Sequence, residues 1–219
     1  MPARSAHYCL EAQIIGRKAK DKAGQRIAGK LVAVVAKAAY RSVSLKDERS
    51  EKTFNYRSRA AEVAHSEVMA PENAAFWLKS ENGNGGLGTT RGKELRERLW
   101  NTIEKVEKRS DSELAREFIV SLPVQLNRQQ QIEAVRDWCN SELVARGYVV
   151  DLSLHQSRKK NNPHAYVLAT LRPVGGEGFG KKPDMFIWYY WVEAGWRRSE
   201  VRQLCSLKGY FDSTKAGAG

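Results

Sequence analysis

The sequence contains little cysteine and no long hydrophobic run. Its three cysteines, Cys9, Cys139 and Cys205, lie far apart and form no C-x-x-C pair, so neither a thiolate zinc site nor a disulfide framework is indicated. The longest apolar runs, 31–36 and 185–192, are far shorter than the roughly 20 residues that span a bilayer. A secretory signal pattern is also missing from the first residues. We therefore expect a protein of the reducing cytoplasm that does not insert into a membrane.

Positive charge, by contrast, is abundant. The 219 residues include 37 Lys and Arg against 25 Asp and Glu, which gives a formal net charge of +12. Hydrophobic residues make up 42% of the chain, enough for a folded core beneath a solvated surface. A chain with this charge is expected to bind a polyanion. The candidates are nucleic acid, an anionic membrane surface and an acidic protein. A basic protein that is merely soluble is the alternative on charge alone.

Hydrophobic periodicity predicts a mixture of strands and helices. Apolar residues at every second position indicate strands, and apolar residues three or four apart indicate helices. Strands are expected over 8–15, 117–122, 148–155 and 164–172, and helices over 30–42, 93–108, 111–116, 128–146 and 192–206. The segment 16–30 is interpreted as a loop, 46–59 as a surface excursion that holds a short hairpin, and Pro71 as the start of a short helix. Antiparallel strands mixed with helices predict the α+β class, with one domain over 1–182 and a helical extension and tail over 183–219.

Two histidines bracket one predicted turn. His155 ends a strand and His164 begins the next, so a hairpin can bring both imidazoles close together on one sheet face. Alternation places Asp151 and Ser153 on the face of His155, and Tyr166 on the face of His164. Paired imidazoles suit a divalent metal such as Mn²⁺, Mg²⁺ or Zn²⁺, of which Zn²⁺ is the better imidazole partner. Two solvated surface histidines are the alternative on this pattern alone.

These histidines lie in a stretch that resembles a known motif. Residues 151–155 (DLSLH) and 162–166 (NPHAY) are similar to the metal motif of the MobA/MobL (MobQ-type) plasmid relaxases. The segment 38–42 (AAYRS) resembles the nucleophile motif of that family. The resemblance runs in order over about residues 6–182. Its further blocks are 65–68 (HSEV), 71–74 (PENA), 99–101 (LWN), 107–109 (EKR), 114–117 (LARE) and 178–180 (GFG).

The resemblance implies a fold, a reaction and partners. Relaxases of this type have a palm-like antiparallel β-sheet flanked by helices, an HUH-type arrangement, so 1–182 is expected to be the catalytic domain. Tyr40 is expected to attack one phosphodiester of single-stranded or hairpin DNA at a plasmid transfer origin, to become joined to the 5′ end and to leave a free 3′ hydroxyl. His155 and His164 are expected to hold the metal that polarises the phosphate, with Glu117 near it. Accessory relaxosome proteins and coupling proteins are further expected partners.

The residue types agree with this chemistry. A free phenol has a pKa of about 10, so Tyr40 needs a base or a metal to act as a nucleophile at neutral pH. Transesterification conserves the bond energy, so the cut strand can be rejoined. Lysines and arginines supply contacts to the phosphate backbone, and a solvated basic face is the alternative for each of them. The basic residues expected to bind DNA are Lys37, Arg41, Arg158, Lys159 and Lys160.

One position departs from the family motif. The second histidine of the N-P-H-x-H pattern is replaced by Tyr166, whose neutral phenol is a poor ligand for hard divalent ions. Water, Glu117 or Asp151 could complete the metal shell. The segment before Tyr40 is also longer than the family pattern, and Tyr56 is the next candidate nucleophile. The alternative function is a relaxase-like module that holds single-stranded or hairpin DNA without cutting it, and a basic interaction protein without DNA chemistry is a third hypothesis.

Overall fold

Five antiparallel strands form the central sheet of the protein, as shown by a computed structural model. The structure describes residues 10–20, 26–42, 44–74, 90–156, 163–182, 189–192 and 195–198. In spatial order the strands are β1 (Leu10–Gly16), β7 (Glu113–Ser121), β9 (Pro163–Ala169), β8 (Val150–Gln156) and β6 (Val63–Met69). Every neighbouring pair is antiparallel. Strand β9 is the third of the five, so it has a hydrogen-bonded partner on each side.

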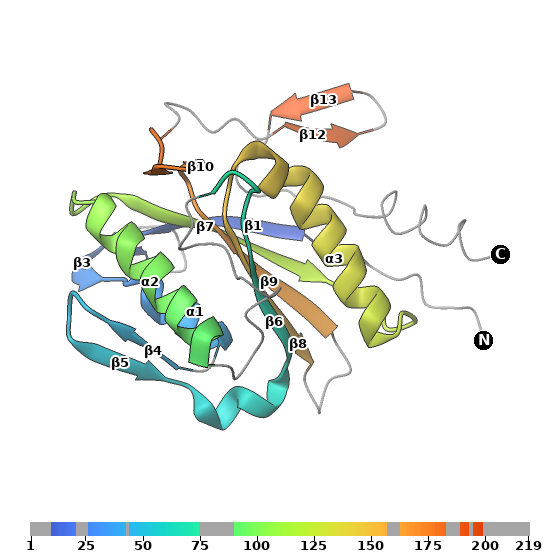
Figure 1. The fold of residues 1–219 in the computed structure, drawn as a ribbon, viewed down its shortest axis with the longest axis horizontal. Helices are drawn as coiled ribbons and strands as arrows, with labels where there is room; N and C mark the ends of the chain where they lie inside the picture. The colour runs from blue at the N-terminus through green and yellow to red at the C-terminus, as the bar shows by residue number, and fades with distance from the viewer. Residues whose placement is uncertain are drawn as a thin grey trace.

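Helices cover both faces of this sheet (Figure 1). They are α1 (Val34–Ser42), α2 (Thr90–Val106) and α3 (Arg128–Glu142), with the short 3₁₀ helices η1 (Arg57–Glu62) and η3 (Val144–Arg146). Helices α1 and α2 pack on the face that carries His155, which we call the α1 face, and α3 packs on the opposite face. The predicted α+β fold, an antiparallel sheet flanked by helices, is therefore confirmed. Within the described ranges, no helix is both long enough and apolar enough to cross a membrane.

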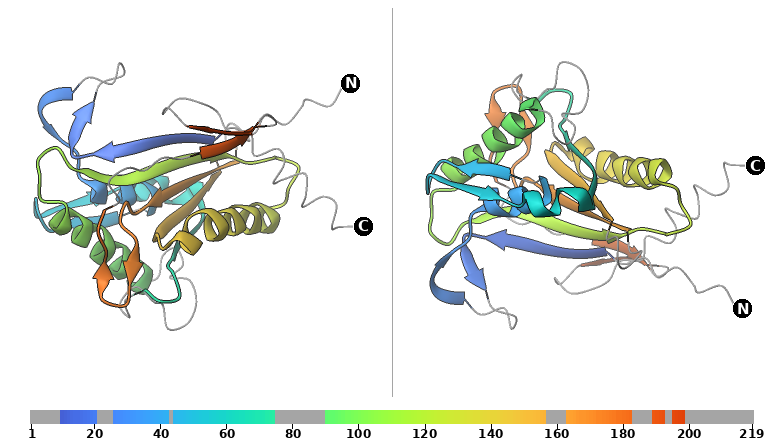
Figure 2. Two further views of the ribbon diagram at one scale, coloured as in Figure 1. Left: turned by 90° about the horizontal axis from the view of Figure 1, so that it is seen from above. Right: turned by 90° about the horizontal axis from the view of Figure 1, so that it is seen from below.

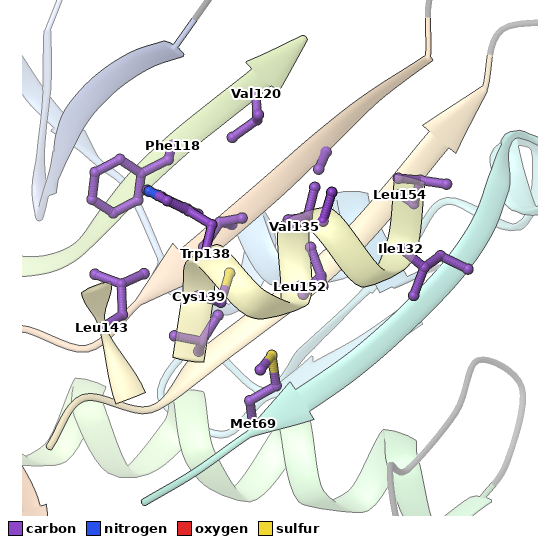
Figure 3. Packing of buried hydrophobic residues seen from close by; sticks show 14 of the residues in the cluster. Met69, Phe118, Val120, Ile132, Val135, Trp138, Cys139, Leu143, Leu152 and Leu154 are labelled. Carbon is purple, nitrogen blue, oxygen red and sulfur yellow. The ribbon is translucent and has the colours of Figure 1, made fainter. Parts of the chain in front are cut away.

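Helix α3 buries an apolar core against the sheet. It begins with a capping box, in which Asn127 accepts from the backbone N–H of Gln130 and the Gln130 side chain accepts from that of Asn127. Trp138 meets the ring of Phe118 edge to face, with centroids 5.4 Å apart. Figure 3 shows this cluster between the helix and the strands. The following η3 ends at Gly147, whose φ of 90° is a left-handed conformation that favours glycine.

The α1 face combines a close-packed helix with buried charges. Four small or branched residues of α1 are fully buried on this face: Val34, Val35, Ala38 and Ala39. Below α2, Asp151 on β8 accepts hydrogen bonds from Nε of Arg96 at 2.8 Å and from Nε1 of Trp100 at 2.9 Å. All three side chains are buried, and these hydrogen bonds satisfy their polar groups inside the protein. This cluster fixes α2 onto β8.

Several two-stranded hairpins lie outside the main sheet (Figure 2). They are β2 (Lys18–Lys20) with β3 (Arg26–Leu31), β4 (Ser44–Asp47) with β5 (Lys52–Asn55), β10 (Val174–Gly175) with β11 (Gly178–Phe179), and β12 (Tyr189–Val192) with β13 (Gly195–Arg198). The hairpin expected within 46–59 is confirmed, since β4 and β5 pair there. The loop expected over 16–30 is wrong, because β2 and β3 pair in that segment. A ribbon outside the main sheet needs no apolar face of its own, so hydrophobic alternation does not mark it.

Two strands of the main sheet differ from the sequence expectation. The helix expected over 111–116 is wrong, because β7 begins at Glu113 and pairs with β1 and β9 on its two sides. These pairings outweigh the local helix preference of the residues. Strand β6 was not anticipated, since its register shifts between Val63 and His65 and the shift interrupts a simple alternation.

The C-terminal part also departs from expectation. A helix was expected over 192–206, but Val192 ends β12 and β13 occupies Gly195–Arg198. The aromatic and branched residues of β12 have high strand propensity, which explains a hairpin at this position. Residues 199–206 lie outside the described residues. So does the short helix expected after Pro71, beyond the turn that ends at residue 74.

Candidate active site

Two histidines face each other on the α1 face of the sheet. Strands β8 and β9 pair so that His155 lies directly opposite His164, as the hairpin predicted. Their ring centroids are 5.9 Å apart. Tyr166, two residues further along β9, places its ring centroid 5.0 Å from each imidazole and nearly perpendicular to both rings. Three aromatic side chains therefore share one patch on these two strands.

The ring of His155 has a defined orientation. Its Nε2 lies 3.4 Å from the backbone carbonyl oxygen of Arg41, in the last turn of α1. Because a carbonyl oxygen only accepts, Nε2 carries the proton and Nδ1 keeps its lone pair. Burial lowers the pKa of His155 to about 4, so the imidazole is neutral near pH 7. The Nδ1 atom is buried and has no hydrogen-bond partner.

A buried ion pair lies beside this ring. The guanidinium of Arg41 pairs with the carboxylate of Glu117 on β7, and Gln13 on β1 donates to the other carboxylate oxygen. The Cζ of Arg41 also lies 4.8 Å from the centroid of the Tyr166 ring, within cation–π range. Burial lowers the pKa of Arg41 to about 10, which leaves the side chain charged at neutral pH. The expected phosphate contact through Arg41 is therefore corrected, because its side chain is held inside the protein.

Tyr40 lies one residue before Arg41, at the partly exposed end of α1. Its ring meets that of Tyr56 edge to face, with centroids 5.3 Å apart. The Cζ of Arg59 lies 4.3 Å from the centroid of the Tyr40 ring. The carbonyl of the next residue, Arg41, lies 3.4 Å from Nε2 of His155, so Tyr40 and the histidine pair lie at the same end of the α1 face.

The remaining basic candidates are placed differently. Lys37 is half-buried on α1, one turn before Arg41, and burial lowers its pKa. Its contact with DNA stays a prediction. The other three predicted contacts lie outside the described residues, and these are Arg158, Lys159 and Lys160.

Comparison with known proteins identifies the family. The model described as the MobA/MobL family matches residues 32–205, well over half of the chain. The chain belongs to the MobA/MobL family. It is 35% identical over 149 residues to the "Probable conjugal transfer protein TraA" of Sinorhizobium fredii, and 35% identical over 150 residues to the "Conjugal transfer protein TraA" of Rhizobium radiobacter. Each match covers 68% of the chain but 13% of the TraA protein, so the chain spans a small part of the length of these relatives.

A further relative and a solved structure agree with this assignment. The "Mobilization protein MobL" of Acidithiobacillus ferridurans is 31% identical over 154 residues, which is 70% of the chain and 33% of that protein. A solved structure described as "Molecular Basis of Vancomycin Resistance Transfer in Staphylococcus aureus" matches with a TM-score of 0.62 and 25% identity. That match covers 97% of the chain and 88% of the solved one, so the two share their fold.

In this MobA/MobL protein, His155 and His164 are the predicted metal ligands that the structure brings together. Among the residues that the structure describes, no group of three or more His, Cys, Asp or Glu side chains gathers. Asp151 is bound to two side chains of α2 and Glu117 is bound to Arg41, so neither expected carboxylate is available as a third ligand. The unpartnered Nδ1 of His155 fits a cation.

Sequence reasoning missed the residues that surround Tyr40 and the ion pair. Gln13, Arg59 and Glu62 belong to no block of the family motif that the sequence displays. The spacing of Arg59 and Glu62 is that of a helical i, i+3 ion pair, which is a local signal. It does not reveal that the ring of Tyr40 lies beneath the arginine, because that contact depends on how the β4–β5 hairpin folds back onto α1.

Proposed function

We propose that this chain nicks one DNA strand at a plasmid transfer origin and rejoins it, with Tyr40 as the nucleophile. The observation that carries the proposal is the last turn of α1, where Tyr40 precedes the residue whose carbonyl lies 3.4 Å from Nε2 of His155. A phenol and an imidazole pair at one end of a sheet are the parts that tyrosine-based strand transfer needs. The relatives described as conjugal transfer and mobilization proteins support the same function.

In the proposed reaction, Oη of Tyr40 attacks the phosphorus atom of one phosphodiester. The new bond joins this oxygen to phosphorus, and the bond from phosphorus to the 3′ oxygen breaks. The phenol proton leaves to solvent, and the departing 3′ oxygen takes up a proton to become a free hydroxyl. One phosphate ester is exchanged for another, so attack by the 3′ hydroxyl on the phosphotyrosine rejoins the strand.

The proposal includes a divalent cation, Mn²⁺ or Mg²⁺ with Zn²⁺ as a further candidate, held by Nδ1 of His155 and by His164. When bound, such a cation acts as a Lewis acid that offsets charge on the phosphate oxygens. The chain itself prepares His155 for this role in two ways. Burial keeps the ring neutral, and the carbonyl of Arg41 holds the proton on the opposite nitrogen.

The proposed substrate is single-stranded or hairpin DNA, and the proposed compartment is the cytoplasm. The net charge of +12 supports a polyanionic substrate, because neutralising phosphates releases the counterions that surround them. Accessory relaxosome proteins and coupling proteins are proposed as further partners.

A labelled oligonucleotide separates strand transfer from binding alone. The chain is incubated with a single-stranded oligonucleotide that contains the transfer origin of its plasmid, together with Mn²⁺, Mg²⁺ or Zn²⁺, and the products are resolved under denaturing conditions. A 3′-end label is expected to migrate with the protein, because the tyrosine binds the 5′ phosphate of the downstream fragment. A 5′-end label is expected on a free shorter strand, and EDTA is expected to prevent both products. Tight binding without an adduct at any of these metals would contradict the proposal.

A non-cleaving DNA-binding module is the second candidate function. The observation that favours it is Tyr166, which occupies the place of the third family histidine and leaves two imidazoles as metal donors among the described residues. In this case the chain holds transfer-origin DNA but its metal affinity is too low for chemistry. The metal affinity of the histidine pair therefore separates the two candidates.

Replacing Tyr166 with histidine is expected to tighten the binding of Mn²⁺ or Zn²⁺ by about ten- to a hundredfold. The tyrosine ring lies 5.0 Å from each imidazole, so a third imidazole at this position can reach the same ion. Isothermal titration calorimetry of the metal-free protein measures the change. Tyr148→His is the matched control, since Tyr148 precedes the first residue of β8, whereas His155 lies near its last residue. Equal affinities for the two variants would show that the metal site has been placed wrongly.

A further inference from the structure

Arg59 covers the ring of Tyr40. It lies in η1, between β5 and β6, and its Cζ is 4.3 Å from the centroid of that ring. Tyr56 contacts the same ring at an interplanar angle of 81°, so two side chains pack against the ring of Tyr40. The side chain of Arg59 is 33% exposed. A partly exposed arginine therefore touches the proposed nucleophile.

Glu62 holds Arg59 in this place. Nε and Nη2 of Arg59 donate to Oε2 of Glu62 at 2.9 and 2.6 Å. The hydrogen bond from Arg59 lowers the pKa of Glu62. A partly exposed pair of neighbouring residues contributes little to stability, so a phosphate can displace the carboxylate at small cost.

The other basic residues around Tyr40 are less suited to meet a phosphate there. Arg41 is buried and paired with Glu117. Lys37 is half-buried, and burial disfavours its charge. Arg57 is exposed and lies two residues before Arg59 in the same turn, which makes it a control of equal charge.

We propose that Arg59 binds the scissile phosphate, exchanging the Glu62 carboxylate for two non-bridging phosphate oxygens. This inference rests on the proposed function and adds the group that brings phosphate and phenol together. A guanidinium presents paired N–H donors that match two phosphate oxygens. In this position Arg59 offsets the negative charge that repels an oxygen nucleophile, and it orients Tyr40 toward phosphorus. Before DNA arrives, Glu62 keeps the guanidinium ordered over the ring.

Single-turnover rates at saturating oligonucleotide test the role of Arg59 in strand cleavage. Arg59→Ala is expected to slow adduct formation about 100-fold, with Arg59→Lys between this variant and the wild type. Arg57→Ala removes the same charge from the same turn and is expected to stay within about threefold of the wild type. Free guanidinium ion is expected to restore part of the rate of Arg59→Ala, which a misfolded protein would not show. Equal rates for the two alanine variants would overturn the inference.

A binding measurement tests the phosphate contact without any cleavage. An oligonucleotide with a neutral methylphosphonate at the scissile position is expected to bind the wild type at least about threefold more weakly than the natural one. Arg59→Ala is expected to bind both equally. Glu62→Gln is expected to tighten binding of the natural oligonucleotide about threefold, and Arg59→Ala with Glu62→Gln is expected to lose this gain. If the wild type forms no adduct, the proposed function fails, whereas equal discrimination by the wild type and Arg59→Ala refutes the phosphate contact alone.

Discussion

Replacing Tyr40 with phenylalanine is expected to abolish the covalent protein–DNA adduct. The substitution removes only Oη, so the ring keeps its T-shaped contact with Tyr56 and its place beneath Arg59. Loss of a nucleophile lowers a rate by roughly a thousandfold or more, while DNA affinity and the free energy of unfolding are expected to stay at wild-type values. The amount of denaturation-resistant adduct, measured beside oligonucleotide binding by fluorescence anisotropy, checks both parts.

Tyr56→Phe is the matched control for this experiment. It removes an equivalent hydroxyl from the neighbouring ring, whose centroid lies 5.3 Å from that of Tyr40, and it is expected to leave adduct formation intact. An adduct that persists in Tyr40→Phe and disappears in Tyr56→Phe would move the nucleophile to the start of η1. An adduct that forms in both variants would show that neither Tyr40 nor Tyr56 is the nucleophile.

Replacing Glu117 with alanine is expected to lower the free energy of unfolding by about 3 to 5 kcal/mol. The substitution leaves the charge of Arg41 buried without its carboxylate, and it also removes the acceptor of the Gln13 side chain. Urea unfolding at neutral pH measures the loss. A cost below about 1 kcal/mol would show that water or another side chain solvates Arg41 in its place.

Removing both charges together separates the ion pair from the space that it fills. Arg41→Met combined with Glu117→Leu is expected to recover most of the stability lost in Glu117→Ala, because apolar side chains of similar volume often replace a buried pair without penalty. The backbone carbonyl of Arg41 stays in the double variant, so the contact with His155 is kept. A double variant as unstable as the single one would mean that the hydrogen bond from Gln13, rather than the ion pair, stabilises this region.

The histidine pair could be predicted from the sequence because side chains along a strand alternate with a period of two. His155 and His164 end and begin strands on either side of one turn, so their pairing follows from alternation once the hairpin is assumed. The position of Tyr166 beside them follows from the same period. This part of the site depends on local structure alone, and local structure is what a single sequence displays.

The burial of Arg41 could not be predicted from the sequence, for a physical reason. Arg41 follows Tyr40 in a basic stretch, which favours a phosphate contact. Consecutive residues of a helix point about 100° apart, so the partly exposed Tyr40 and the buried Arg41 face different surroundings. Which way the helix is turned is decided by packing of Ala38 and Ala39 on the sheet and by Glu117, 76 positions further along the chain.

Arg59 and the full length of β7 were hidden in a similar way. Arg59 reaches Tyr40 only because the β4–β5 hairpin returns the chain to the end of α1. The start of β7 has residues that favour a helix in isolation, and the pairing with β1 and β9 makes them a strand. Contacts between distant segments determine the position of Arg59 and the start of β7, and the neighbouring residues do not predict these contacts.

The contact between Arg41 and His155 joins residues 114 positions apart. During synthesis, Tyr40 leaves the ribosome long before β8 and β9 exist, and closing a loop of this length requires most of the sheet to be in place. A nascent or truncated chain therefore carries an exposed tyrosine without the imidazoles that serve it. Under the proposed function, the capacity to break DNA therefore arises only with the finished fold.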